Sequence, residues 1–324
     1  MKRILAFLMI LIILSCSFSA AAFDANQNIN TTLMFYENNI KEVKESDEIL
    51  SLKMTKKAKF LTFTPMTTSE CDFEDISSLS EFIIGNVSCG NTKVKNFDGV
   101  DMAKKLADFQ KNDGSFCDNL SENFYAMIAL DMYGQKYDRE SAFDYILSKQ
   151  LENGSFSNDI ELTALAIITM SDRVMKDMDI INSVNKAITF LNENQLADGG
   201  FENASGEDNA VTLSLVISAL SSVGADPKDE RWRGILDSTE KFKNKDGSYR
   251  LLSDGEEKYD QKATSKMLMA LNDAKNLKSS YKQVGIYTIY SPMKNTISQM
   301  VMLVLIFVTI FVTSIIVTKK RKLG

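Results

Sequence analysis

The side chains most able to do chemistry in this sequence are carboxylates, because the 324-residue chain contains no histidine. Ser-His-Asp and Cys-His catalysis are therefore excluded, and the commonest neutral metal ligand is missing. The chain also lacks a Cys-x-x-Cys pair, so we expect neither a zinc site nor another metal or cofactor. The roles that remain are those of an acid, a base or a cation ligand.

Seven carboxylates precede or begin segments that read as apolar helices. If those helices are arranged alike, the carboxylates form an acidic ring around one mouth, able to take a cation, a basic ligand or a polar partner. The competing interpretation is capping, because helix starts favour acidic side chains. The seven residues are Asp118, Glu122, Asp159, Glu161, Glu207, Asp208 and Asp260.

The segments that would position these carboxylates repeat along the chain. Four copies share a glycine followed two residues later by Phe or Tyr, and three of them begin with Gln; the glycines are 40, 45 and 48 residues apart. We expect the glycines to end helices in the left-handed conformation, the glutamines to satisfy turn backbone, and the aromatic rings to wedge between repeats. The motif residues are Gln110, Gly114, Phe116, Gln150, Gly154, Phe156, Gln195, Gly199, Phe201, Gly247 and Tyr249.

Each repeat pairs two kinds of predicted helix. Before the turn the pattern is amphipathic, as in residues 142–151, and after it the helix is apolar almost all round, as in 162–170 and 211–220. A helix that is apolar on every side must be buried on every side. Alternation therefore predicts two concentric layers, built from four helical hairpins over residues 100–284. Residues 23–99 are expected to be helical in part, around 30–41 and 75–84, and packed on the repeats.

This repeat resembles that of the terpene cyclase and prenyltransferase superfamily, whose members form α/α toroids. The stretch 210–264 is similar to the recurring unit of bacterial and archaeal surface proteins with prenyltransferase-like repeats. The resemblance covers about residues 100–276 and implies an all-α fold, an α/α toroid. It implies function weakly, because one fold hosts many functions.

An enzymatic alternative follows from the same resemblance. Class II terpene cyclases protonate an alkene with the central acid of Asp-x-Asp-Asp-Thr-Ala, and residues 159–164 read Asp-Ile-Glu-Leu-Thr-Ala. Glu161 would be the general acid beside Asp159, but Leu162 replaces the final acid. A capping box, with Asn158 as N-cap and Glu161 at the third helical position, explains the segment more simply. A corrinoid-type ligand carrier is a further alternative, on fold analogy alone.

Both ends of the chain read as membrane signals. Residues 1–22 have the layout of a cleaved signal peptide, with lipidation at Cys16 as the alternative. Residues 297–318 are long and apolar enough to span a bilayer, and the basic tail 319–324 places that end in the cytoplasm. Residues 285–296 would form a stalk. The bulk of the chain is thus expected outside the cell, on a single-pass anchor.

The exported part is acidic and carries few cysteines. Without the two terminal segments the chain has 31 basic and 43 acidic residues, a formal charge of −12. Such a surface should repel nucleic acid and anionic lipid. One disulfide among Cys71, Cys89 and Cys117 is plausible outside the cell; Cys71 with Cys89 is one possible pair, and the sequence does not assign the pairing. Taken together, the sequence favours a non-catalytic surface module that binds an unidentified ligand or protein.

Overall fold

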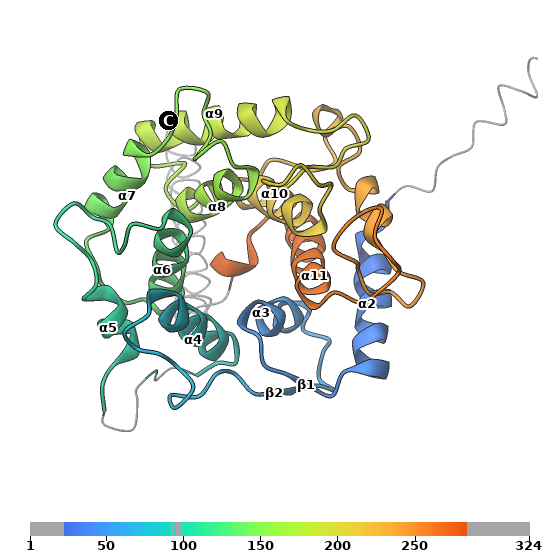
Figure 1. The fold of residues 1–324 in the computed structure, drawn as a ribbon, viewed down its shortest axis with the longest axis horizontal. Coiled ribbons are helices and arrows are strands. Elements are labelled where there is room, and N and C mark those ends of the chain that lie inside the picture. Colours follow the sequence, from blue (N-terminus) through green and yellow to red (C-terminus); the bar gives the residue numbers. More distant parts are fainter. Residues whose placement is uncertain (1–22, 92–93, 95–98, 284–324) are drawn as a thin grey trace, which may run out of the picture.

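Two concentric layers of helices surround a central axis in the computed structural model, which describes residues 23–91, 94 and 99–283 (Figure 1). In the inner layer each helix contacts the next, and the last contacts the first, so the ring is closed. The inner helices are α3 (Ser46–Thr55), α4 (Ile76–Ser88), α6 (Leu120–Tyr133), α8 (Ile160–Met170), α10 (Ala210–Ser222) and α11 (Gln261–Asn276).

The outer layer is built from shorter or more amphipathic segments. α9 shows the expected stripe, because its buried residues recur on one side while the other side is polar. α7 buries one face in the same way but ends at Ser148, which leaves Leu151 of the predicted stripe 41% exposed. The outer elements are α2 (Ala25–Asn39), α5 (Met102–Ala107), α7 (Arg139–Ser148), α9 (Met178–Glu193) and the 3-10 helices η1 (Glu230–Trp232) and η2 (Asp237–Phe242).

Inner helices are buried on all sides, as their composition requires. Every residue is buried from Thr163 to Met170 in α8 and from Ala210 to Ser221 in α10. Transferring that much apolar surface from water is the main stabilising contribution to the ring, at about 25 cal/mol per Å².

The repeated turn holds each outer segment against the next. Gly114 adopts a φ of +87°, and a Cβ there would lie 2.0 Å from the carbonyl oxygen of Ser141 in α7. The amide of Gln110 donates to the carbonyls of Gly114 (3.2 Å) and Asp138 (2.7 Å), bridging the turn to the start of α7. Gln150 and Gln195 make the same two-carbonyl bridge in their repeats. The aromatic rings of the motif are buried: Phe116, Phe156, Phe201 and Tyr249.

The N-terminal region completes the ring. The turn glycine of the fourth repeat, Gly247, packs on α2, where an added Cβ would lie 2.5 Å from the Thr31 carbonyl oxygen. The Thr32 hydroxyl donates to the Gly247 carbonyl (2.9 Å). α2 therefore takes the place of a further outer helix, and α3 and α4 fill the gap between α11 and α6 in the inner ring.

The fourth hairpin departs from the expected helix pair. Its outer segment consists of the 3-10 helices η1 and η2, because Arg233 (φ +40°) and Gly234 (φ +73°) interrupt the chain between them. A two-residue parallel pairing of β1 (Glu42–Val43) with β2 (Thr62–Phe63) is a small departure from an all-α fold. No helix within the described ranges is long and apolar enough to cross a membrane, and the predicted span 297–318 lies outside them.

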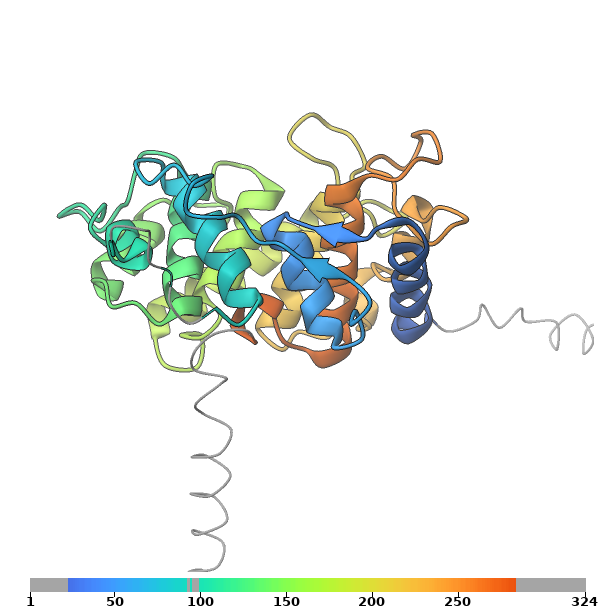
Figure 2. The same ribbon diagram turned by 90° about the horizontal axis from the view of Figure 1, so that it is seen from below.

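The inner helices run in one direction, because each outer segment returns the chain to the same end (Figure 2). We call the end where they begin the mouth and the end where they finish the base. The mouth faces the reader in Figure 1 and lies at the top of Figure 2. The short helix η3 (Ser280–Lys282) follows α11 and lies at the base, near the axis.

Candidate functional site

Two of the seven predicted mouth carboxylates cap inner helices. Asp159 accepts from the backbone N–H of Leu162 (2.8 Å), and Asp260 accepts from that of Ala263 (2.7 Å). The expected capping box is wrong, because Asp159 is the N-cap of α8. Glu161 therefore stands at the second helical position, where its side chain points to the neighbouring helix α10 instead of back to the cap.

The other acids near the axis are engaged by neighbouring elements. Glu161 accepts from the hydroxyl of Thr212 in α10 (2.6 Å), Asp208 is 2.6 Å from the ammonium of Lys241, and Glu122 accepts from the thiol of Cys117 (3.4 Å). Two acids lie further out. Asp118 pairs with Lys111 at 3.0 Å and is fully exposed, and Glu207 accepts from the amide of Asn203 at 3.0 Å. The mouth is thus an acidic rim whose members are also held by local contacts.

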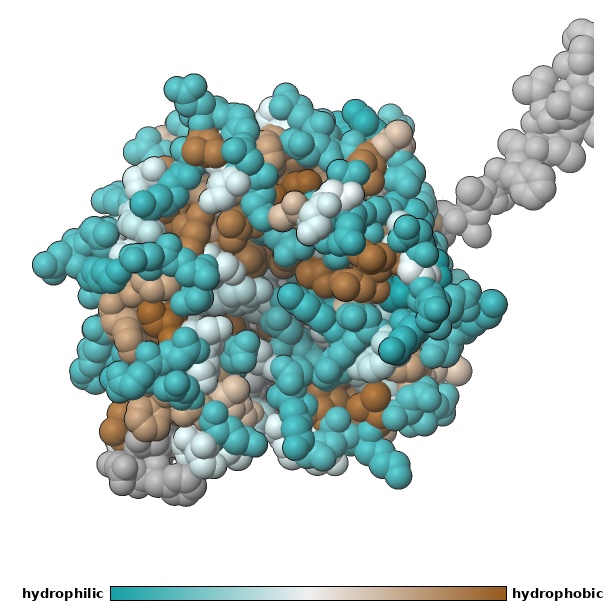
Figure 3. All heavy atoms as spheres, viewed as in Figure 1, coloured by the Kyte–Doolittle hydropathy of each residue, from teal (hydrophilic) through white to brown (hydrophobic). Residues whose placement is uncertain are grey.

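The mouth face is hollowed at its centre. Figure 3 shows hydrophilic side chains over most of the outer rim, with hydrophobic patches between the rim and the axis. Side chains deeper in the ring decide what this hollow can hold.

A buried polar cluster occupies the centre of the ring. The ammonium of Lys266 in α11 lies 2.6 Å from a carboxylate oxygen of Asp47 in α3 and donates to the hydroxyls of Tyr281 (2.9 Å) and Tyr125 (3.4 Å). The Tyr281 hydroxyl donates to the other Asp47 oxygen at 2.7 Å. Lys266 is 2% exposed and Tyr281 1%, whereas the side chain of Asp47 is 27% exposed.

The charges in this cluster stabilise each other. Burial raises the pKa of the Asp47 carboxyl, but the ammonium of Lys266 outweighs that effect and holds it below its ordinary value. Burial lowers the pKa of Lys266, but the Asp47 carboxylate and the two tyrosines raise it well above its ordinary value. Burial and the same carboxylate raise the pKa of Tyr281. The cluster is therefore a fixed ion pair at neutral pH, with two neutral phenols.

η3 closes the base with three successive anchors. The Ser280 hydroxyl donates to Asp273 in α11 (2.5 Å), Tyr281 enters the central cluster, and the ammonium of Lys282 lies 3.2 Å from Asp131 and 3.6 Å from Asp172. These contacts join η3 to α3, α6, α11 and the end of α8. η3 therefore closes the base of the ring, and we call it the plug.

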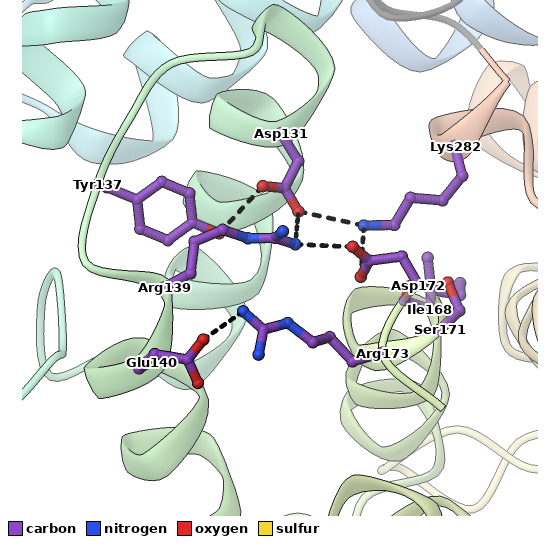
Figure 4. A network of polar contacts seen from close by, with 9 residues as sticks. All are labelled: Asp131, Tyr137, Arg139, Glu140, Ile168, Ser171, Asp172, Arg173 and Lys282. Carbon is purple, nitrogen blue, oxygen red and sulfur yellow. Dashed lines mark hydrogen bonds and ion pairs between the residues drawn. The ribbon is translucent and has the colours of Figure 1, made fainter. Parts of the chain in front are cut away.

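Lys282 belongs to a wider ion-pair network, shown in Figure 4. The guanidinium of Arg139 bridges Asp131 (2.9 Å) and Asp172 (2.8 Å) from the other side. Burial raises the pKa of Asp172, but Lys282 and Arg139 lower it overall. The two carboxylates are therefore neutralised by two cations, which fixes the plug to the ends of α6 and α8.

Asp273 is a fully buried carboxyl in α11 whose ordinary pKa is strongly perturbed. Burial raises its pKa to about 8, against the opposing hydrogen bonds from Ser280 and Ser218. At neutral pH it is mostly protonated, so it adds no charge at the base.

Sequence reasoning missed Asp47, Lys266 and the plug. The sequence held one signal for Lys266, because this lysine directly precedes the apolar run Met-Leu-Met-Ala-Leu at residues 267–271. Nothing in the local sequence pairs it with Asp47, which is 219 positions away along the chain.

The cysteine expectation is corrected by the structure, in which Cys71, Cys89 and Cys117 are free thiols. Cys71 lies beside Ser78 in the first turn of α4, and Cys89 caps its other end. A helix of this length separates its ends by roughly 18 Å, far beyond the ~7 Å that a disulfide can bridge. Burial raises the pKa of each thiol, to about 11 for Cys117.

Two helical layers, closed by tight turns with glutamine bridges, define the class of α/α toroid proteins. A family model of the prenyltransferase alpha-alpha toroid domain matches residues 60–208 and, overlapping it, residues 162–298. The chain belongs to this family. No curated protein matches the sequence.

Proposed function

We propose that this chain is a non-catalytic binding module, anchored to the membrane by residues 297–318 and displaying its toroid outside the cell with the mouth facing away from the bilayer. The observation that carries the proposal is the central cluster. An ion pair between Asp47 and Lys266, together with the ring of Tyr281, fills the axis where a cyclase must hold its hydrocarbon.

The enzymatic alternative gains no support from the position of Glu161. A strong acid for alkene protonation must point into an apolar, aromatic-lined chamber. Glu161 instead accepts a hydrogen bond from Thr212 at the mouth.

The direction of the anchor follows from the end of the described chain. η3 lies at the base, and the described residues end one position later, at Gln283. In the proposed arrangement, a span that begins at residue 297 is attached to the base and leaves the mouth free. The mouth is acidic, so its ligand is expected to be a cation, an amine or a basic segment of a protein.

The anchor is tested by protease treatment of intact cells that produce the full chain with a tag after Gly324. The expected result is release of the toroid into the medium, while the tag stays protected until the cells are opened. A full chain that resists protease until lysis, or that leaves the membrane in alkaline carbonate, would contradict the proposal.

The binding role is tested by thermal stability of the full chain in detergent, with divalent cations, polyamines, corrinoids, glycans and polyprenyl compounds. A ligand that binds only the folded form raises the midpoint by mass action. We expect a cationic ligand to raise the midpoint of thermal unfolding of the wild type. The same ligand should leave the midpoint unchanged in the double variant Glu161→Gln with Asp208→Asn. A rise that the double variant retains would place the site elsewhere.

A further inference from the structure

The base exposes apolar side chains at three of its loop tips. Met175 is 90% exposed and Met178 72%, the two highest values among the large hydrophobic residues of the described chain. Met175 lies in the connection from α8 to α9, and Met178 is the first residue of α9. Leu277, directly after α11, is 41% exposed, and Phe60, shortly after α3, is 40% exposed. Figure 2 shows these connections at the bottom, the end at which the described chain finishes.

Lysines accompany the apolar tips. Residues 53–60 contain four lysines and residues 275–283 contain three, and neither segment has an acidic residue. Lys53, Lys56 and Lys59 line a groove of about 280 Å³ together with the apolar residues Leu52, Ala58, Leu61 and Phe63. The ammonium of Lys53 lies 4.0 Å above the ring of Phe63. The groove combines positive charge with apolar walls, as a phospholipid headgroup and its glycerol end require.

Three acids at the base are already held by cations or by burial. Asp131 and Asp172 are held by Arg139 and Lys282, and Asp273 is buried and largely protonated. Asp177 caps α9. The loop 224–233 carries as many acidic as basic residues. Uncompensated positive charge therefore gathers at the adjoining ends of α3 and α11.

We propose that the base is a membrane-docking surface that rests on a bilayer with anionic headgroups, with Phe60, Met175, Met178 and Leu277 entering the interface and the lysines meeting lipid phosphates. The inference deepens the proposed anchoring and rests on it for geometry. Residues 284–296 can reach at most about 45 Å, so a span at 297–318 permits this contact without enforcing it. The lysines and the exposed apolar side chains make contact between the base and the bilayer favourable.

The overall charge of −12 does not prevent such docking, because the mouth carboxylates lie at the other end and the ion-paired acids of the base add little net charge. An inner helix of 14 residues, such as α6, is roughly 21 Å long, more than twice the Debye length of about 8 Å at physiological ionic strength. The mouth carboxylates are therefore largely screened from a bilayer at the base. The expected repulsion from anionic lipid holds for the mouth and not for the base.

Lysine footprinting tests the inference on the full chain reconstituted into vesicles. One preparation is zwitterionic and the other carries 30% anionic phospholipid; both are treated with a neutral amine-acylating reagent and examined by mass spectrometry. We expect at least a threefold slower modification of Lys57, Lys59 and Lys278 in the anionic vesicles, reversed by high salt. Lys258 and Lys262, exposed at the mouth, serve as internal controls with equal rates in both preparations.

Flotation of the same samples separates this inference from the anchor. Chains that float with both vesicle types but show equal basal and mouth rates would leave the anchor intact and overturn the docking surface. Flotation with anionic vesicles alone, with protected basal lysines, would overturn the anchor and support the docking surface. Chains that float with neither type would contradict both.

A charge-reversed variant provides the second readout. Lys57→Glu with Lys59→Glu should remove the protection of Lys278 in anionic vesicles, whereas Lys258→Glu with Lys262→Glu should leave it unchanged. Both pairs are exposed, so neither change is expected to unfold the ring. Protection of Lys278 that survives the basal reversal would overturn the proposal.

Discussion

The mouth and the base are made from the two ends of the same inner helices, yet they use charge differently. At the mouth, exposed or capping acids are held one at a time: Asp159 caps a helix start and Asp118 pairs with one neighbour. The buried Glu48, at the start of α3, is the exception, because it accepts hydrogen bonds from Tyr36 and Gln261. At the base, buried cations and acids form networks that join several helices, as Lys282 does with Asp131 and Asp172. Replacing a single exposed acid at the mouth should therefore change stability little, whereas the buried charges of the centre and the base hold the ring together.

This difference bears on function. A rim of individually held acids can exchange its local partners for a ligand at little cost, because exposed ion pairs contribute about 0–1 kcal/mol. A buried network loses several kcal/mol when one partner is removed, so it is suited to holding shape. This contrast supports the proposal that the mouth binds a ligand and the base attaches to the membrane.

The sharpest test of the contrast compares two lysines of α11. Lys266→Ala leaves Asp47 without its ammonium in the centre and should lower the free energy of unfolding by about 3–5 kcal/mol. Lys262→Ala, exposed at the mouth end of the same helix, should change it by less than about 0.5 kcal/mol. Urea unfolding followed by circular dichroism measures the free energy of unfolding of both variants. Similar losses of stability in the two variants would contradict the difference between central and mouth charges.

A second test concerns how the ring closes. Gly247→Ala must fit a Cβ 2.5 Å from the Thr31 carbonyl at a φ of +91°, so we expect a loss of roughly 3 kcal/mol from overpacking and strain. Gly206→Ala has a similar φ of +76° but open space, and should cost about 1 kcal/mol. Equal losses in thermal unfolding would mean that α2 does not close the ring on this turn.

A third test uses pH at the base. Because the pKa of Asp273 is raised to about 8, the folded form binds a proton that the unfolded form has released, so this residue's contribution to stability is lost as pH rises toward 8. The slope should approach 1.4 kcal/mol per pH unit between pH 5 and 7. Asp273→Asn should flatten it and raise the melting temperature at pH 8. A variant that keeps the wild-type slope would refute this role.

The smallest effects are expected at the mouth. Asp159→Ala removes the N-cap of α8 and should cost about 1 kcal/mol. Asp118→Ala removes a fully exposed partner of Lys111 and should cost close to nothing. Differential scanning calorimetry of the two variants checks the order, and a larger loss for Asp118→Ala would show that the rim is more coupled than its contacts indicate.

The repeat unit could be predicted from the sequence because its signals are local. The spacing of Gly114, Gly154 and Gly199, and the apolar composition of α8 and α10, follow from backbone conformation and burial within one hairpin. The closure by α2, α3 and α4 could not be predicted, because those helices lack the turn motif and meet the repeats only in the folded ring.

Long-range charge pairing was equally invisible in the sequence. Asp47 and Lys266 are far apart along the chain, and an acid near a helix start reads as a cap wherever it lies. The Cys71–Cys89 expectation failed because sequence separation does not reveal that α4 keeps the two thiols at opposite ends. The shift of the α8 cap from Asn158 to Asp159 is a boundary effect of one residue.

The central claim is that the interior of the ring is structural and not a reaction chamber. The most direct measurement incubates the purified full chain with polyprenyl hydrocarbons and diphosphates of 15 to 30 carbons (about the range a toroid could enclose) and analyses the products by mass spectrometry. We predict no cyclised product and no difference between the wild type and Glu161→Gln. A product that forms with the wild type and disappears in Glu161→Gln would contradict the claim.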